Sequence, residues 1–276
     1  MSENSVATPV HLLQAKVIFL SFLLTGGFVA TYSAFNRHLR QITSVHDIPA
    51  SVFRRKYLYG KVTSVGDGDN FLFFHTPGGM LGGWHWLRKV PTLQRRGTQP
   101  KRTQKASSTA LSGVSRFNLL RSLAGLYPQD RSANQFALYR GRRKLPTLSI
   151  RLCGVDAPER AHFGNSSQPL SEEAYIWLNK TLLGRFVWVK PLSTDQYGRC
   201  VAKVEYWSWF RWKNVSLELL KQGLGVVYES KSSAEFDGED SLYRYYESKA
   251  KKSKRGVWGL RHFETPGAYK KRVNKQ

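Results

Sequence analysis

Carboxylates and arginines recur at expected turns and strand ends of this 276-residue chain. The residues are Asp67, Asp69, Arg151, Asp156, Glu159 and Arg199. Hard divalent cations take carboxylate and carbonyl oxygens as ligands, polarise a phosphoryl group and lower the pKa of a bound water. The planar fork of arginine matches phosphate oxygens, on which charge gathers in the transition state. Together these side chains suit metal-assisted cleavage of phosphate esters, with a remaining carboxylate to orient or deprotonate the attacking water.

Each of these signals is weak by itself, and their ordered combination carries the specificity. An Asp-Gly-Asp turn is more often structural than catalytic, because both residue types build turns. The chain has no GxSxG elbow, HExxH helix or GxxxxGK[ST] loop, so serine hydrolases, zincins and P-loop enzymes lack their minimal motifs. Its two cysteines, Cys153 and Cys200, are too few for a disulfide framework and lack zinc-site spacing, so we expect both to be buried apolar residues.

Five strands are expected to position the carboxylates and arginines. The stretch from Tyr57 to His75 predicts a strand, a tight turn at Asp67-Gly68-Asp69 and a second strand. LSIRLCGVDAPE, residues 148–159, predicts a third strand that ends in a Pro-containing turn. RFVWVKPL and RCVAKVEYW predict two more strands, on either side of the turn STDQYGR. Each candidate residue therefore falls at or near the end of a strand.

Three helices accompany these strands. The first lies in SEEAYIWLNKTLLG, with Ser171 as its N-cap ahead of acidic residues. The second runs from about Asn214 to Gln222 and is stopped by Gly223, and the third runs from about Asp240 to Lys254 and is stopped by Gly256. Strands with tight turns and helices in these places predict an α+β fold centred on a small closed β-barrel rather than a parallel sheet.

The positive charge of the chain predicts an acidic partner. There are 43 Lys and Arg against 19 Asp and Glu, a formal net charge of +24, and nucleic-acid phosphates or anionic lipid headgroups are the usual neutralisers. Fourteen of the basic residues and one acid lie in a low-complexity stretch at about 76–145, giving it a net charge of +13. Two interpretations stay open: that this insertion adds affinity for nucleic acid, or that it is a basic loop with no dedicated partner.

A transmembrane anchor is expected at residues 17–35, VIFLSFLLTGGFVATYSAF, which are uncharged and long enough to cross a bilayer. Glu3 in the leader and the bulky end of the segment argue against a cleaved signal peptide. One basic residue precedes the segment, whereas several follow it, and the positive-inside rule then keeps the C-terminal body on the non-translocated side. These residues are Lys16 before the segment and Arg37, Arg40, Arg54, Arg55 and Lys56 after it.

The anchor also carries a stripe of small residues, Gly26, Ala30 and Ala34. Such a small-xxx-small stripe lets two helices approach closely, so one interpretation is a weak homodimer through the anchor. Small residues are common in membrane helices, however, and a chance pattern is the favoured interpretation.

The order of the motifs resembles the staphylococcal-nuclease-like (thermonuclease) family over about Tyr57 to Trp258. The matching segments are DGDN, IRLCGVDAPE, DQYGR, KNVSLELLKQGLGVVY and AKKSKRGVW. The anchor, the basic insertion and the FETPGAYKKR tail are similar to the fungal branch of membrane-anchored mitochondrial endonucleases. The resemblance implies an OB-like barrel of five strands with three helices, calcium as the cofactor, DNA or RNA as the substrate and a single-pass mitochondrial membrane location.

The resemblance also implies roles for the site residues. Asp69, Asp156 and the backbone carbonyl of Ala157, which stands where the family often has Thr, would bind Ca²⁺. The catalytic residues would be Arg151 and Arg199, which hold and stabilise the scissile phosphate, and Glu159, which acts on the water.

The resulting organisation has five parts: a short leader (1–16), the anchor (17–35), a basic connector (36–56), a nuclease-like domain (57–262, with the insertion at about 76–145) and a basic tail (263–276). The favoured hypothesis is a membrane-anchored, calcium-dependent endonuclease that hydrolyses phosphodiester bonds of DNA or RNA. The alternative is a non-catalytic tether that binds nucleic acid or anionic lipid on the same barrel. The complete set of five charged site residues favours the enzyme.

Overall fold

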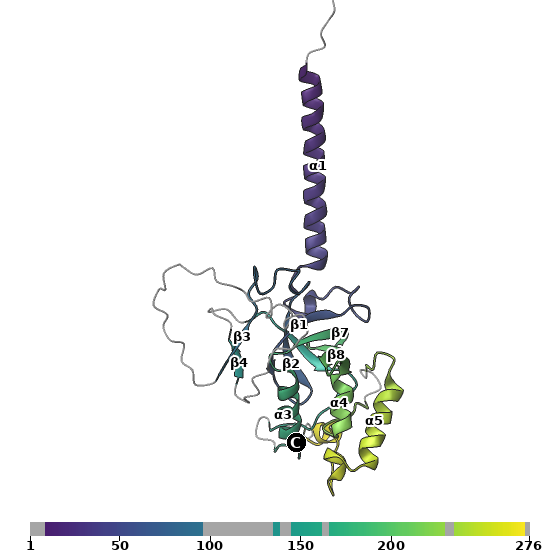
Figure 1. Ribbon diagram of the computed structural model, residues 1–276. Coiled ribbons are helices and arrows are strands. Elements are labelled where there is room, and N and C mark those ends of the chain that lie inside the picture. Colours follow the sequence, from purple (N-terminus) through teal and green to yellow (C-terminus); the bar gives the residue numbers. More distant parts are fainter. Residues whose placement is uncertain (1–8, 96–134, 139–144, 162–165, 230–234, 274–276) are drawn as a thin grey trace, which may run out of the picture. The chain divides into compact units, whose positions relative to one another are not determined.

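The computed structural model describes residues 9–95, 135–138, 145–161, 166–229 and 235–273 (Figure 1). The chain divides into two compact units, Met1–Gln41 and Ile42–Gln276.

The first unit contains helix α1, Pro9–His38. Its part from Lys16 to His38 is long and apolar enough to cross a membrane, judged by length and composition. The hydroxyl groups of Ser21 and Thr31 donate to carbonyl oxygens four residues earlier, at 2.8 and 2.7 Å. Polar side chains satisfied within their own helix are what a lipid environment requires, so this helix is suited to an apolar surrounding.

Five strands of the second unit close into a barrel, which confirms the predicted α+β fold. The strands are β1 (Leu58–Val65), β2 (Asn70–His75), β5 (Leu148–Leu152), β7 (Phe186–Thr194) and β8 (Cys200–Ser208). They follow the order β5-β2-β1-β7-β8, and a parallel pairing of β5 with β8 closes the ring. The other pairings are antiparallel. Strand β5 therefore lies between β2 on one side and β8 on the other.

The barrel is filled by apolar side chains that alternate along the strands. Register shifts at Val62/Ser64 in β1 and at Pro191/Ser193 in β7 bend the strands at two points of the ring. Pro191 lies at one of these irregularities, where a missing N–H donor is tolerated. The fully buried interior residues include Val62, Phe71, Phe73, Leu148, Ile150, Val187, Val189 and Val204.

Short strands extend this barrel beyond what the sequence patterns predicted. β9 (Arg211–Asn214) pairs with β8, and β6 (Val155–Asp156) pairs with β10 (Val226–Val227). β3 (Thr92–Arg95) and β4 (Gln135–Leu138) form an antiparallel pair inside the basic insertion. The sequence of that stretch has little periodicity to indicate strands, and the residues between these two strands lie outside the described part of the chain.

The three predicted helices are present as α3 (Ser171–Leu182), α4 (Val215–Gln222) and α5 (Asp240–Lys252), and Figure 1 shows them gathered on one side of the strands. The Asn214 side chain caps α4 by accepting from Ser216 N at 2.9 Å, an interaction that contributes about 1 kcal/mol.

The predicted capping of α3 by Ser171 is wrong. The cap position is Leu170, which has a left-handed backbone (φ 64°) and makes no side-chain capping bond. The chain enters the helix through a tight turn in which the carbonyl of Gln168 accepts from the N–H of Ser171 at 3.2 Å. Ser171 is therefore the first helical residue, and its side chain is buried.

The C-terminal segment, predicted as a basic tail, contains a helix. α6 runs from Pro266 to Val273 and follows the 3₁₀ turn η2 (Gly256–Gly259). Thr265 precedes it, and the Thr265 hydroxyl accepts from Ala268 N at 3.3 Å. A proline at the first helical position is favourable because its missing N–H has no helical partner in any case. A second 3₁₀ turn, η1 (Val45–Asp47), precedes the barrel.

Both cysteines are buried and free, as the sequence predicted. The Cys153 sulfur lies 3.2 Å from the Tyr243 hydroxyl, a contact that joins the end of β5 to α5. Burial raises the pKa of the Cys153 thiol to about 11, so at neutral pH it is a small protonated core residue rather than a nucleophile.

We expect Gly223→Ala to destabilise the barrel by about 3 kcal/mol or more, because positive-φ strain and a steric clash add together. Gly223 ends α4 with φ 66°, and a Cβ there would lie 2.2 Å from the Arg255 carbonyl oxygen. Gly238 is the matched control, because it has φ 81° but its surroundings leave open space for a methyl group. Gly238→Ala should cost only about 1 kcal/mol. Urea unfolding measures both variants, and equal losses would contradict the close packing of α4 against η2.

Candidate active site

The candidate site lies where β2, β5 and β6 bring their ends together. Asn70 at the start of β2 pairs with Arg151 in β5, and the N–H of Leu152 donates to the carbonyl oxygen of Asp69 at 2.9 Å. Two residues of turn separate β5 from β6, which ends in Asp156. The barrel pairing thus places Asp69, Arg151 and Asp156 next to one another although more than eighty residues separate the first two.

Arg151 holds the two aspartates together. Its side chain is 8% exposed, its Nη2 lies 3.2 Å from Asp156 Oδ1, and its Nε lies 3.5 Å from Asp69 Oδ2. The guanidinium carbon stands 4.5 Å from the centre of the Tyr228 ring. Burial alone would lower the pKa of Arg151, but the charges of Asp69 and Asp156 outweigh it and raise the pKa. The guanidinium is therefore a permanent cation in this site.

One donor of Arg151 has no hydrogen-bond partner within the described residues. Its Nε is buried, and the distance to Asp69 is that of an ion pair rather than a hydrogen bond. A buried donor without an acceptor is costly, by about 1–3 kcal/mol. An anionic oxygen that entered the site would find this donor available.

Asp156 is the most deeply buried carboxylate of the site. Burial raises the pKa of Asp156 to about 6, and the charge of Asp69 adds to this rise, whereas Lys270 and Arg151 oppose it. Two carboxylates this close repel each other and hold a proton or a cation more tightly than either would alone. The pair is therefore a site for positive charge.

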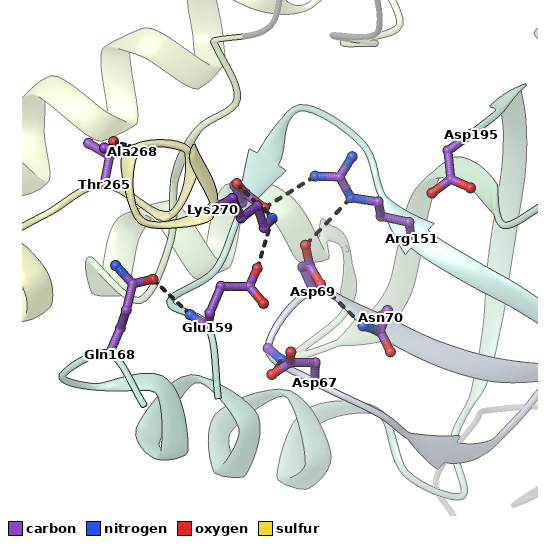
Figure 2. A network of polar contacts seen from close by, with 12 residues as sticks. Asp67, Asp69, Asn70, Arg151, Glu159, Gln168, Asp195, Thr265, Ala268 and Lys270 are labelled. Atoms are coloured by element: carbon purple, nitrogen blue, oxygen red, sulfur yellow. Dashed lines mark hydrogen bonds and ion pairs between the residues drawn. The ribbon is translucent and has the colours of Figure 1, made fainter. Parts of the chain in front are cut away.

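Glu159 is fixed through its own backbone. The Gln168 side-chain oxygen accepts from Glu159 N at 2.9 Å, and the Gln168 amide nitrogen donates to the Glu264 carbonyl at 2.8 Å. Figure 2 shows the Glu159 carboxylate pointing toward Lys270, and the Asp69 carboxylate lies nearby. The side chain of Glu159 is 22% exposed, so water can reach it.

Lys270, which the sequence patterns did not indicate, completes this cluster. Its Nζ lies 3.0 Å from Asp156 Oδ1 and 2.7 Å from Glu159 Oε1. Burial lowers its pKa, but the charges of Asp156 and Glu159 outweigh that effect and raise it. The prediction of a basic tail at residues 263–276 gives Lys270 no part in the site. The available signal was Thr265-Pro266, a helix start ahead of a Lys-rich last turn.

Arg199 is held within its own turn by Asp195. Its Nε pairs with Asp195 Oδ2 at 2.7 Å, and its N–H donates to Asp195 Oδ1 at 2.9 Å. It directly precedes β8, whose first residue, Cys200, pairs with Ile150 in β5. The turn that carries Arg199 is therefore next to the strand that carries Arg151, but the described ion pairs do not join Arg199 to the three carboxylates.

Ala157 is buried against the hairpin turn. A Cβ on Gly68 would come within 2.6 Å of the Ala157 Cβ and 3.0 Å of the Ala174 Cβ. Glycine is thus required in the Asp67-Gly68-Asp69 turn by close approach. This contact brings the backbone after Asp156 to the turn that carries Asp69.

The oxygen donors of the site suit a calcium ion. Carboxylate and carbonyl oxygens are the ligands that Ca²⁺ prefers, and those of Asp69, Asp156 and Ala157 come from adjoining segments. Among the described residues, no three His, Cys, Asp or Glu side chains already form a metal-binding group. An ammonium group, that of Lys270, stands between Asp156 and Glu159 instead. The residues fit a hard cation, with a lysine as the counter-ion in this arrangement.

A closed five-stranded barrel with charged residues gathered at one edge belongs to the OB-like class of folds. The model of the family of staphylococcal nuclease homologues matches residues 149–259. Three relatives called probable endonuclease LCL3 match almost the whole chain. That of Eremothecium gossypii is 87% identical over 276 residues, with all of both chains covered.

Two further relatives of this name are from Kluyveromyces lactis and Zygosaccharomyces rouxii. The Kluyveromyces lactis relative is 52% identical over 276 residues, which cover 99% of this chain and all of the relative. The Zygosaccharomyces rouxii relative is 50% identical over 277 residues, which cover 99% of each chain. The chain belongs to the staphylococcal-nuclease-like family. Because this is a family of phosphodiester-cleaving enzymes, the sequence-based prediction of a nuclease-class hydrolase is confirmed.

We expect Arg151→Met to lower the free energy of unfolding by about 3–5 kcal/mol at pH 7, because two buried carboxylates lose their shared cation. Arg151 is one of the charges that oppose the raised pKa of Asp156, so its loss raises that pKa further, and the folded variant takes up a proton as the pH falls and recovers stability. The loss should therefore be smaller at pH 5 than at pH 7. Urea unfolding in mild detergent measures both.

Arg244→Met is the control, since the Arg244–Asp240 pair is exposed on α5 and its loss should leave the free energy of unfolding nearly unchanged at both pH values. A loss for Arg151→Met that is the same at both pH values would contradict the assignment of Arg151 as the counter-ion of Asp69 and Asp156.

Proposed function

We propose that this protein is a membrane-anchored, calcium-dependent endonuclease that hydrolyses phosphodiester bonds of DNA or RNA. The observation that carries the proposal is the buried Arg151 between Asp69 and Asp156, with Glu159 at the solvent-accessible side. A guanidinium that is held charged, two carboxylates suited to a hard cation and a third carboxylate reached by water are the parts that phosphodiester hydrolysis needs.

Substrate binding is assigned to the two arginines. Arg151 keeps a buried Nε donor without a hydrogen-bond partner among the described residues, and a non-bridging phosphate oxygen is an acceptor of the right charge. Arg199, on the neighbouring turn, would leave Asp195 to contact the same phosphate as the substrate enters. The Arg199 side chain is about a quarter exposed, so this movement does not require the core to open.

Asp69, Asp156 and the Ala157 carbonyl would hold Ca²⁺. When bound, the ion would supply positive charge next to the phosphoryl oxygens and acidify a water. Burial raises the pKa of Asp156, and the repulsion from Asp69 raises it further, which supports the need for a cation at this place.

Glu159 is assigned the role of general base for the attacking water. Its carboxylate would accept a proton as the water oxygen attacks phosphorus, the P–O bond to the leaving group breaks on the opposite side, and the leaving oxygen takes up a proton from solvent. Gln168 holds the backbone of Glu159 and so fixes the start of this side chain. The arginines stabilise the charge that develops on the phosphate oxygens.

The charge distribution supports a polyanionic substrate. The chain carries 43 basic and 19 acidic residues, and a basic excess of this size draws nucleic acid to a surface over long distances. A non-catalytic binding protein would share this charge but would have no use for a water-accessible carboxylate next to a buried arginine.

We expect the full chain in mild detergent to digest DNA or RNA with Ca²⁺ and to stop on addition of EDTA. Glu159→Gln should lower the rate by about 10²–10⁴-fold, because a general base is lost while the shape of the side chain is kept. The readout is the rate of fragment formation on a labelled oligonucleotide.

Glu172→Gln is the control for this test, because Glu172 is an exposed residue of α3 that pairs with Arg160 at the surface. Cleavage that survives chelation, or that Glu159→Gln leaves at the level of Glu172→Gln, would refute the proposed mechanism. Binding without any cleavage would favour the non-catalytic tether.

The membrane location is a second part of the proposal. It is supported by helix α1, whose length and composition suit a bilayer, and by the basic residues that follow it, which favour a body on the non-translocated side. The mitochondrial membrane is proposed from the resemblance to the fungal anchored endonucleases.

Alkaline carbonate extraction of cell membranes should leave the full chain in the pellet and release a chain that begins at Ile42. Replacing Leu23 and Leu24 by Arg should release the full chain as well, since each charge at the middle of a membrane helix costs about 3 kcal/mol. Replacing Arg54 and Arg55 by Gln is the control and should leave the chain in the pellet. A full chain found in the carbonate supernatant would rule out the anchor.

A further inference from the structure

A lysine from the far end of the chain occupies the cation-binding position of the site. Lys270 Nζ lies 3.0 and 3.2 Å from the two oxygens of Asp156 and 2.7 Å from Glu159 Oε1. Figure 2 shows this side chain reaching from α6 toward Glu159, on the same side as Asp69 and Arg151. A single ammonium group thus bridges one carboxylate proposed for the metal and the one proposed for the water.

This position is built by several contacts of the C-terminal segment. Gln168 is buried and joins the Glu159 backbone to the Glu264 carbonyl. The Tyr269 hydroxyl donates to the Ser166 carbonyl. Arg272 binds both carboxylate oxygens of Glu264 at 3.1 and 3.0 Å. These contacts dock α6 against the segment that follows Asp156 and present Lys270 to the carboxylates.

A lysine ammonium is a compact point charge on a flexible stem, and in this respect it resembles a small hydrated cation. Both groups need the same carboxylate oxygens of Asp156. A divalent ion and an ammonium about 3–4 Å apart would repel each other strongly in a partly buried site. The site can therefore hold Lys270 or a metal ion at Asp156, but not both with full contacts.

We propose that Lys270 is a tethered counter-ion that calcium must displace, so that the C-terminal helix sets the calcium concentration at which the site fills. This inference rests on the proposed function, because it takes Asp156 as a calcium ligand. Displacement also frees Glu159 from its ion pair, which is the state in which a carboxylate can accept a proton from water.

The exposed fractions of the Lys270 and Asp156 side chains indicate that Lys270 is the partner that moves. The Lys270 side chain is 42% exposed, whereas that of Asp156 is 3% exposed. Lys270 can swing its charge into water at little desolvation cost, but Asp156 has to stay and needs a replacement cation. The exchange of Lys270 for calcium thus leaves no buried charge unpaired.

The test is calcium binding by the full chain in mild detergent, measured by isothermal titration calorimetry without substrate. Lys270→Met removes the charge and keeps most of the stem. Calcium should bind it at least about five-fold more tightly than the unaltered chain, the factor expected for removing a single charge near 4 Å even at high dielectric. Lys271→Met is the control, because it removes the same charge from the neighbouring, exposed position.

Equal affinities of Lys270→Met and Lys271→Met would overturn the proposal while leaving calcium binding intact. If neither variant nor the unaltered chain binds calcium, the proposed cofactor fails together with this inference, and the two failures are thereby distinguished.

Hydrogen exchange gives a second readout that does not depend on the affinity. Calcium should speed amide exchange in residues 264–273 of the unaltered chain, because α6 loses one of the contacts that hold it when Lys270 leaves Asp156. In Lys270→Met the exchange of this segment should already be fast and should not change with calcium. Slower exchange of the segment on calcium binding to the unaltered chain would overturn the proposal.

Discussion

Asp69 and Asp156 are both buried, and the cost of burying their charges governs the arrangement around them. A carboxylate loses several kcal/mol of hydration when it leaves water, and a second one nearby adds repulsion. Arg151 offsets this cost by contacting both from within the barrel wall. It remains charged because its pKa is raised by the same two carboxylates. The charged residues of the site therefore stabilise one another, and loss of one of them leaves a buried charge without its partner.

The barrel makes this set possible through the two neighbours of β5. On one side, the antiparallel pairing with β2 fixes Arg151 beside the end of the turn that carries Asp69. On the other side, the parallel pairing with β8 brings in the turn that carries Arg199. A parallel contact between strands needs a long connection, and here α3 and β7 provide it. The strand pairings that build the barrel therefore also bring the site residues together.

The local part of this architecture could be predicted from the sequence, and the long-range part only by resemblance. Strand alternation and the Asp67-Gly68-Asp69 turn are local patterns, and the structure has the predicted hairpin. The left-handed Leu170 and the docking of α6 depend on Gln168. Its side chain hydrogen-bonds to the backbone of Glu159 and to that of Glu264, which is far away in the sequence. No local pattern reports such contacts. Arg199 differs in this respect, because its partner Asp195 lies four residues earlier in the same turn.

The two cations of the site differ in a way that matches different tasks. Arg151 is buried, contacts two carboxylates and lies over the Tyr228 ring, so its removal would take from Asp69 and Asp156 the cation that they share. Lys270 comes from the last helix, is partly exposed and contacts Asp156 and Glu159. An immobile arginine suits the binding of a phosphate that arrives with the substrate. An exposed lysine suits a different position. It neutralises the carboxylates when no metal ion is bound, and it can move aside when a metal ion binds. The difference in burial between these two side chains, rather than their shared charge, therefore separates a fixed part of the site from an exchangeable one.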